Sequence, residues 1–168
     1  MSFIVNKDWT TEAGLRAVVI EITQPLMFGQ STWHCGYVAV EEGSPLFGKD
    51  YQDRMPQLKK LFEELKQKES EESIFESYGA IDLLCMAFDD EEDPQLGYCL
   101  QVHGGVTYAI TSNEYPVAVE KELHWIGYDC NHFDDIQLVQ NLNFNIQQCE
   151  SLAKQIAFVS KFLEAQDD

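Results

Sequence analysis

Basic residues are scarce in this sequence. Its 168 residues include 11 Lys and Arg against 29 Asp and Glu, so the formal net charge is −18 with the histidines neutral. Proteins that bind nucleic acid displace counterions with clustered Lys and Arg, and anionic lipid surfaces also attract positive charge. This excess of negative charge argues against direct binding of nucleic acid or of a membrane surface.

The sequence also lacks long apolar runs and paired cysteines. No stretch approaches the roughly 20 apolar residues that span a bilayer, and the start of the chain lacks the basic and apolar regions of a secretory signal. The five cysteines are odd in number, widely spaced and contain no Cys-x-x-Cys pair. Because disulfide-rich secreted domains show the opposite pattern, we expect a soluble, cytoplasmic protein whose cysteines are reduced and buried.

Several motifs of large enzyme classes are missing as well. The sequence contains no complete Gly-x-x-x-x-Gly-Lys-Ser/Thr, no Gly-x-Gly-x-x-Gly, no Gly-x-Ser-x-Gly and no His-Glu-x-x-His. These motifs supply phosphate-binding N–H groups, nucleophiles or metal ligands. Their absence disfavours nucleotide-dependent kinases, dinucleotide dehydrogenases, α/β-hydrolases and zincins.

The apolar content is that of a folded chain. Hydrophobic residues make up 45% of the sequence and aromatic residues 12%, whereas disordered chains combine high charge with too little apolar surface. The length favours one domain with a real core. We expect a single α+β domain over residues 1–168, in which residues 52–96 form an acidic, partly helical insertion.

Stretches rich in β-branched and alternating residues predict about five strands in an antiparallel sheet. They lie at residues 14–22, 33–40, 98–102, 106–110 and 122–129. The short connection between the first two predicts a hairpin. The double glycine at 104–105 predicts either a tight hairpin or one strand broken where the backbone needs positive φ.

Two stretches show helical periodicity. Residues 56–68 place leucines and a phenylalanine on one stripe after a proline that suits a first helical turn. The C-terminal helix is clearer, with Asn145 as a candidate cap, and we expect the sheet to pack against its apolar face. That face consists of Cys149, Leu152, Ala153, Ile156, Phe162 and Leu163. Residues 80–88 fit either a strand or a short buried helix.

Three separated motifs resemble a family of uncharacterised proteins found in bacteriophages, prophages and plasmids. They are Trp-His-Cys-Gly-Tyr-Val at 33–38 with Gly48-x-x-Tyr51, Val-His-Gly-Gly-Val-Thr-Tyr at 102–108, and Trp-Ile-Gly-Tyr-Asp-Cys-x-His-x-x-Asp at 125–135. The resemblance spans 13–51 and 98–165 and leaves out the stretch 52–96. It implies a mobile-element accessory protein in a bacterial cytoplasm, and it implies no particular chemistry.

Histidines and carboxylates in these motifs form a candidate site. If the strand that carries His103 lies beside the strand that ends at Asp129, then His103, Asp129, His132 and Asp135 converge at one end of the sheet. Imidazole and carboxylate ligands hold Zn²⁺, Mn²⁺ or Fe²⁺ with positions open for water, so these residues are candidate ligands of a divalent metal. His103, Asp129 and His132 are also the candidate catalytic residues. The alternative is turn and capping chemistry with no ligand.

Glycines and a tyrosine complete the candidate ligand-binding residues. Gly104 and Gly105 would let backbone N–H groups approach a phosphate or an oxyanion, and Tyr51 lies in the loop after the second strand. His34 and Cys35 suggest a nucleophile pair. Adjacent residues of a regular strand point to opposite faces, however, so we expect Cys35 and Tyr37 to pack on one face and His34 to lie on the other. We expect His124, beside Trp125, to be an ordinary sheet residue.

The acidic residues are concentrated in one stretch. Residues 69–120 contain twelve Asp and Glu and no Lys or Arg. One interpretation is a solvated face that keeps the protein soluble. The other is a negative surface that occupies the basic groove of a host protein, with the run Asp89, Asp90, Glu91, Glu92 and Asp93 as candidate partner-binding residues.

These observations predict a binding protein. We expect a mobile-element accessory protein that binds a host protein or a small ligand, in a counter-defence role, without direct contact to nucleic acid or membrane. The alternative is a metal-dependent hydrolase whose site is the His/Asp set at the end of the sheet. The sequence leaves open whether any catalysis occurs and whether the chain forms a dimer.

Overall fold

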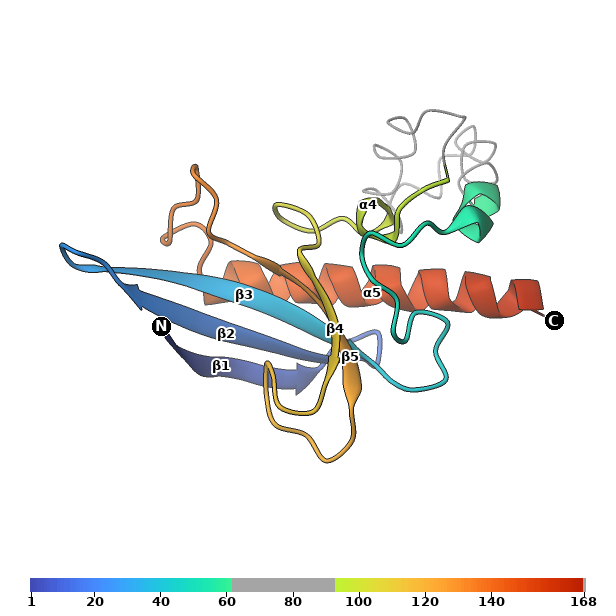
Figure 1. The fold of residues 1–168 in the computed structure, drawn as a ribbon, viewed down its shortest axis with the longest axis horizontal. Helices are drawn as coiled ribbons and strands as arrows, with labels where there is room; N and C mark the ends of the chain where they lie inside the picture. The colour runs from blue at the N-terminus through green and yellow to red at the C-terminus, as the bar shows by residue number, and fades with distance from the viewer. Residues whose placement is uncertain (62–92, 168) are drawn as a thin grey trace.

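A five-stranded sheet forms the centre of the protein in its computed structural model, which describes residues 1–61 and 93–167 (Figure 1). The strand order is β1-β2-β3-β5-β4, and all neighbouring pairs are antiparallel. The strands are β1 (Ser2–Thr10), β2 (Arg16–Pro25), β3 (Gln30–Val40), β4 (Tyr108–Ser112) and β5 (Leu123–Asp129). The long helix α5 (Leu142–Asp167) lies along one face of the sheet. The predicted α+β class, with about five antiparallel strands packed against a C-terminal helix, is confirmed.

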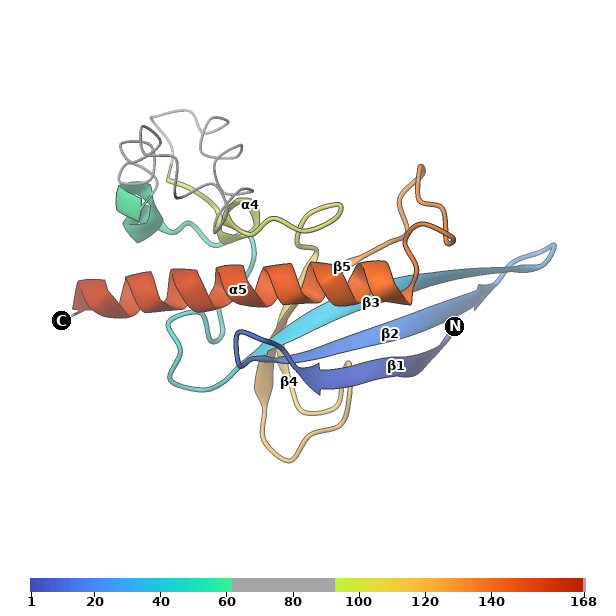
Figure 2. The same cartoon turned by 180° about the vertical axis from the view of Figure 1, so that it is seen from behind.

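The main core lies between α5 and the helix-facing side of the sheet (Figure 2). Alternation along the strands directs Val19, Val38 and Ile126 to this side, where they join Leu152 and Ile156 of the helix. The predicted apolar face of the helix is confirmed, since all six of its residues belong to this core or pack against it. Apolar burial of this kind is the main stabilising term for a helix in a globular protein.

A second, smaller cluster covers the opposite side of the sheet. Trp33, Cys35 and Tyr37 of β3 point to this side, together with Val18, Ile20 and Trp125. Residues from the connection between β4 and β5 pack over them, and the hydroxyl oxygens of Tyr37 and Tyr115 lie 2.7 Å apart. Both faces of the central strands are therefore buried, which explains their nearly continuous apolar sequences.

The predicted hairpin at 14–22 and 33–40 is confirmed as β2 and β3, which pair from Ala17 opposite Val38 to Pro25 opposite Gln30. Strand β1 was not predicted. It is an edge strand with mostly exposed side chains, and its register shifts between Val5 and Lys7. Because only one edge of β1 pairs and little of it is buried, its sequence lacks the alternation by which buried strands are recognised.

The predicted strand at 98–102 is wrong. Residues Leu96–Cys99 form the short helix α4, whose buried Leu96 and Cys99 are three residues apart on one side. The double glycine that follows has positive φ at both Gly104 and Gly105, as expected, but it joins α4 to β4 rather than two strands of a hairpin. A short apolar run fits helix and strand equally well, so periodicity did not separate them.

Helix α5 begins earlier than expected. Asn141 caps it, because its Oδ1 atom accepts a hydrogen bond of 3.1 Å from the N–H of Phe144. The predicted cap, Asn145, instead lies inside the helix and is fully buried. Asparagines at 141, 143 and 145 all offer capping chemistry, and only the buried contacts of Asn145 distinguish them.

Two glycines allow β3 and β5 to pack closely. Gly36 lies opposite Tyr128, and Tyr37 lies opposite Gly127, so each tyrosine ring covers the glycine of the other strand. A Cβ atom at Gly36 would stand 2.5 Å from the Tyr128 ring, and one at Gly127 would stand 2.5 Å from the Tyr37 ring. The Gly-Tyr dipeptides of two sequence motifs thus form one reciprocal contact.

The insertion is described only at its ends. Residues 56–61 are helical, with Leu58 and Leu61 buried, and they are the start of the helix predicted at 56–68. The remainder of that helix and the ambiguous stretch at 80–88 lie outside the described residues. None of the helices in the described ranges is long and apolar enough to cross a membrane.

Candidate functional site

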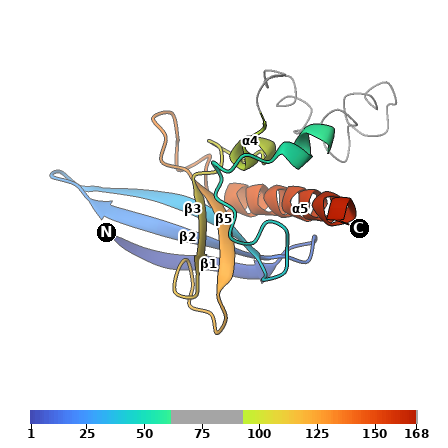
Figure 3. The same ribbon diagram turned by 45° about the vertical axis from the view of Figure 1, so that its right-hand side comes forward.

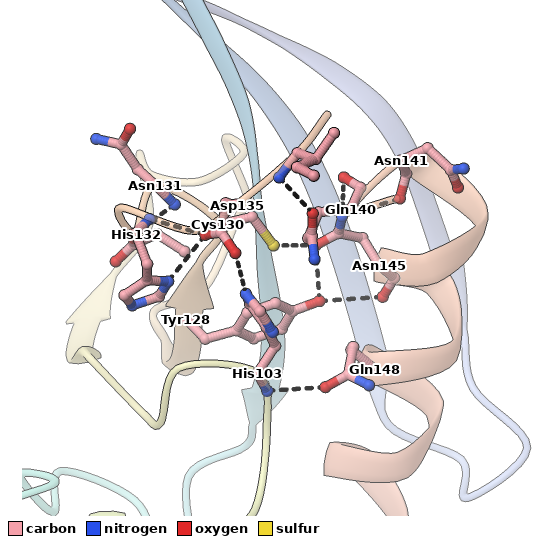
Figure 4. A network of polar contacts seen from close by, with 12 residues as sticks. His103, Tyr128, Cys130, Asn131, His132, Asp135, Gln140, Asn141, Asn145 and Gln148 are labelled. Atoms are coloured by element: carbon pink, nitrogen blue, oxygen red, sulfur yellow. Dashed lines mark hydrogen bonds and ion pairs between the residues drawn. The ribbon is translucent and has the colours of Figure 1, made fainter. Parts of the chain in front are cut away.

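Three of the predicted site residues come together at one end of α5 (Figure 4). His103 Nε2 lies 2.6 Å from Asp135 Oδ1, and His132 Nδ1 lies 2.9 Å from Asp135 Oδ2. One ligand atom from each residue falls within 4.8 Å of the other two. We call these residues the His–Asp–His cluster. The carboxylate of Asp135 uses one oxygen for each imidazole.

Helix α5 positions His103. The backbone N–H of His103 donates a 2.8 Å hydrogen bond to Oε1 of Gln148, and the His103 ring makes an edge contact with the Phe144 ring at 5.4 Å between centroids. His103 lies in the turn between α4 and β4, so this contact ties that turn to the helix. The turn and the helix thus fix the imidazole from two directions.

The loop between β5 and α5, residues 130–141, supplies the other two residues. Its backbone folds on itself: the N–H of His132 donates to Asp135 Oδ2 at 2.7 Å, and the N–H of Asp135 donates to the carbonyl of His132 at 3.1 Å. Gln140 Oε1 accepts from the N–H of Ile136 at 2.8 Å. Short-range turns of this kind hold His132 and Asp135 side by side, three residues apart in sequence.

Gly104 makes room for His132. Its φ is +68°, and a Cβ atom at this position would stand 2.0 Å from Cε1 of the His132 ring. The N–H of Gly105 donates to the carbonyl of Val102 at 2.9 Å, within the turn. The positive φ values of the turn explain why both residues are glycine, and the position of the His132 ring is a second reason at Gly104. Their predicted contact with a phosphate or oxyanion stays a prediction.

Asp129 is the predicted ligand that stands apart. Its carboxylate accepts hydrogen bonds from the hydroxyl of Thr107 at 3.1 Å and from the N–H of Asn131 at 3.1 Å. Tyr128 and Cys130, the residues on either side, both contact Asn145 of α5. Strand alternation therefore turns Asp129 to the other side of the sheet, and the cluster forms with three of the four predicted ligands.

The hydrogen bonds to Asp135 also set its charge. Burial raises the pKa of the Asp135 carboxyl, but the hydrogen bonds from the backbone of His132 and from both imidazoles outweigh burial and leave the pKa below its usual value. Asp135 is therefore ionised at neutral pH and provides a negative charge between the two rings.

The other sequence candidates have packing roles. Cys35 and Tyr37 lie in the same apolar cluster and His34 points to the opposite face, as expected. Burial raises the pKa of the Cys35 thiol to about 11, so it is not an activated nucleophile. Cys35, Cys99, Cys130 and Cys149 are buried and free of disulfides. Tyr51 packs against the main core, and its carbonyl accepts from the N–H of Gly97 at 2.7 Å.

The segment after β3 has part of the spacing of a phosphate-binding loop. Gly43, Gly48 and Lys49 fit Gly-x-x-x-x-Gly-Lys, but Asp50 stands where that motif has Ser or Thr. Residues 42–48 form successive turns, no helix starts directly after Gly48, and Leu46 is buried in the core. Because a phosphate-binding loop leads directly into a helix N-terminus, this segment is not one.

His124 is a buried sheet residue with two hydrogen bonds. Its Nε2 donates to the carbonyl of Lys49 at 2.8 Å, and its Nδ1 lies 3.0 Å from the Thr111 hydroxyl. Burial lowers the pKa of His124. As the pH falls, this histidine therefore becomes protonated in the unfolded chain at a higher pH than in the folded protein. His124 therefore contributes stability that is present above about pH 6.5, the usual histidine pKa, and is lost as the pH falls toward the lower folded pKa.

Replacing His124 with glutamine is expected to reduce this pH dependence. The variant should lose about 1–3 kcal/mol of stability at pH 7.5, because at least one buried partner is left unsatisfied. Its free energy of unfolding should also fall less between pH 7.5 and 5 than that of the native protein. Urea unfolding at several pH values measures both effects, and parallel pH curves for the two proteins would contradict the assignment.

Exposed apolar side chains gather on two loops that the sequence analysis did not single out. The tip of the β2–β3 hairpin and the loop between β5 and α5 project at the same end of the sheet, away from the C-terminus (Figures 1 and 3). Met27 and Phe28 are 90% and 91% exposed, Leu138 is 88% exposed, and Phe133 is fully exposed. We call these two loops the apolar loops. Their exposed large apolar residues are Leu26, Met27, Phe28, Phe133, Ile136, Leu138 and Val139.

Two further features lie elsewhere. A cavity of about 1340 Å³ opens at the other end of β2 and β3, where Arg16, Val40, Glu122 and Ser160 are among its lining residues, and it includes none of the His–Asp–His cluster.

Of the acidic run at 89–93, only Asp93 is described; it is exposed, and its carbonyl accepts from Arg54. The predicted contact of this run with a partner falls mainly on residues outside the described ranges.

Comparison with known proteins adds no family to this picture. No family model matches the chain, and no curated protein and no solved structure matches it.

Proposed function

We propose that this protein acts by binding a partner protein through the apolar loops. The exposure of seven large apolar side chains on two loops at one end of the sheet carries this proposal. Scattered exposed apolar residues are normal on soluble proteins, whereas a concentration of them typically marks an interaction site. Burying one such side chain contributes about 1.5–3 kcal/mol, which offsets part of the entropy lost when two proteins associate.

One of the two loops is held in place before any partner binds. Asp135 and Gln140 form hydrogen bonds within the loop between β5 and α5, and Asp135 also bonds to His103 in a separate turn. Ordering a free loop on binding costs conformational entropy. A loop already fixed at these points avoids much of that cost and presents Phe133 and Leu138 in a defined arrangement.

Charge favours a particular kind of partner. The chain carries a net charge of −18, and the exposed Asp134 lies in the same loop as Phe133. A negative surface repels anionic lipid and attracts a protein whose apolar surface is edged with Lys and Arg. On the expectation that the chain is a mobile-element protein, we take the partner to be a host protein and the complex to have a counter-defence role. The hydrolase alternative needs a substrate-binding cleft beside the His–Asp–His cluster, and the cavity described above lies away from that cluster.

Substitution in the apolar loops is expected to weaken partner binding at least tenfold. The tagged protein should capture a defined protein from a bacterial lysate at low salt, and that protein, once purified, should bind again directly. Replacing Phe133 and Leu138 with serine should weaken this binding at least tenfold, since about 1.4 kcal/mol corresponds to a factor of ten. Calorimetry with the purified partner measures the affinity.

A matched control is available at Ile110, which is 52% exposed on β4. Ile110→Ser should change the affinity less than twofold. Several outcomes would overturn the proposal: no protein retained at low salt, equal binding by all variants, binding to neutral or anionic vesicles alone, or light scattering that shows the loops joining two copies of this chain.

A further inference from the structure

We propose that His103, His132 and Asp135 form a binding site for a divalent transition-metal ion, with Zn²⁺ as the representative cation. The proposed ligand atoms are Nε2 of His103, Nδ1 of His132 and a carboxylate oxygen of Asp135. Two imidazoles and one carboxylate suit Zn²⁺, Mn²⁺ and Fe²⁺, whereas Mg²⁺ and Ca²⁺ prefer oxygen ligands. This inference does not rest on the proposed function.

The spacing of the ligand atoms fits an ion after a small adjustment. Ligand atoms about 2.0–2.2 Å from a metal stand roughly 3–3.5 Å apart from one another. His103 Nε2 stands 2.6 Å from Oδ1 of Asp135, His132 Nδ1 stands 2.9 Å from Oδ2, and one ligand atom from each of the three residues falls within 4.8 Å of the other two. An ion would therefore replace the protons that the imidazoles now share with Asp135, and each ring would carry its proton on its other nitrogen.

The surroundings hold the ligands in this arrangement. Gln148 fixes the backbone of His103, the backbone of His132 donates to Asp135, and Gly104 leaves space for the His132 ring. Groups that orient metal ligands commonly change metal affinity by about 10–100-fold when they are removed. Glycine at 104 thus meets two needs, because its φ of +68° belongs to the turn and the missing Cβ leaves space for the ring of a proposed ligand.

The cluster is also accessible. The side chain of His103 is 25% exposed, that of His132 is 40% exposed and that of Asp135 is 9% exposed. Three protein ligands leave coordination positions that water or an external group would fill from solvent. The carboxylate group of Asp135 and the strongly negative chain both favour a cation at this point.

Metal binding by the full chain tests the inference. The protein is purified without a histidine tag and stripped of metal with EDTA. Calorimetry with ZnSO₄ should show one ion bound per chain. Co²⁺ should bind at the same stoichiometry and give visible absorption bands of nitrogen and oxygen ligands. Mg²⁺ and Ca²⁺ should bind at least 100-fold more weakly. In histidine-selective ¹H–¹⁵N spectra, Zn²⁺ should shift the ring signals of His103 and His132 and leave those of the buried His124 unchanged.

Variants connect the binding to these residues. His132→Gln and Asp135→Asn should each weaken Zn²⁺ binding at least tenfold, while the matched control Asp134→Asn, an exposed neighbour outside the cluster, should bind as the native protein does. Circular dichroism verifies that each variant folds. If a variant does not fold, the histidine-selective spectra of the native chain decide whether His103 and His132 bind Zn²⁺. The inference is overturned by absence of Zn²⁺ binding at micromolar concentrations, by unshifted His103 and His132 signals, or by affinity unchanged in both variants.

Discussion

Replacing Asn145 with alanine is expected to lower the free energy of unfolding by about 2–4 kcal/mol, because several buried polar groups lose their partner at once. Asn145 is fully buried. Its Oδ1 accepts from the Tyr128 hydroxyl at 2.9 Å and from the Cys130 thiol at 3.4 Å. Its Nδ2 donates to the carbonyls of Gln140 and Asn141 at 3.1 and 2.9 Å. One side chain thus joins β5, the loop before α5 and the first turn of that helix.

Asn143 provides the control for this experiment. It lies two residues away in the same helix, and its side chain is exposed, so Asn143→Ala should change stability by less than about 0.5 kcal/mol. Tyr128→Phe removes the hydroxyl that Asn145 binds. In a double-mutant cycle the two substitutions should be coupled by about 1 kcal/mol or more. Equal effects of the Asn143 and Asn145 substitutions in urea unfolding would contradict the role of this network.

Replacing Gly36 with alanine is expected to destabilise the protein by about 2 kcal/mol or more, since forcing extra volume into a packed core commonly costs about 1–3 kcal/mol. The added Cβ atom would stand 2.5–2.6 Å from ring atoms and the hydroxyl oxygen of Tyr128. Tyr128 is almost fully buried and its hydroxyl bonds to Asn145. The ring has little space in which to move, and any movement also weakens that hydrogen bond.

A second substitution tests whether the ring is the cause. In a Tyr128→Leu background the aromatic ring is absent, so Gly36→Ala should cost at least 1 kcal/mol less than it does in the native protein. Thermal and urea unfolding of the four proteins gives this difference. If the cost is the same in both backgrounds, then the strand requires glycine for a reason other than the contact with Tyr128.

Much of the fold was predictable because its patterns are local. The β2–β3 hairpin, β5 and the apolar face of α5 each follow from a run of residues with period 2 or 3.6. The failures occurred where local patterns are ambiguous. Leu96–Cys99 is too short for periodicity to assign, β1 is an exposed edge strand, and the asparagines at 141, 143 and 145 all offer the same capping chemistry.

The candidate site was predictable in part. His132 and Asp135 are neighbours in one loop, but His103 reaches them only because its turn contacts α5 through Gln148 and Phe144. Asp129 lies apart from these three residues, because alternation along β5 separates it from Tyr128 and Cys130. The exposure of the apolar loops was not predictable, because a sequence does not show whether an apolar loop residue is buried or exposed.

The sequence by itself determined the strong negative charge, the antiparallel α+β class with one amphipathic helix, and the presence of histidine and aspartate at short spacing. These follow from composition and from periodicities that a strand or a helix imposes on its own residues. Only the tertiary structure decided that Asn145 is a buried link rather than a cap, that His103 meets His132 and Asp135, and that seven apolar side chains of two loops face solvent. Each of these depends on contacts between segments far apart in the chain, and such contacts leave no local pattern.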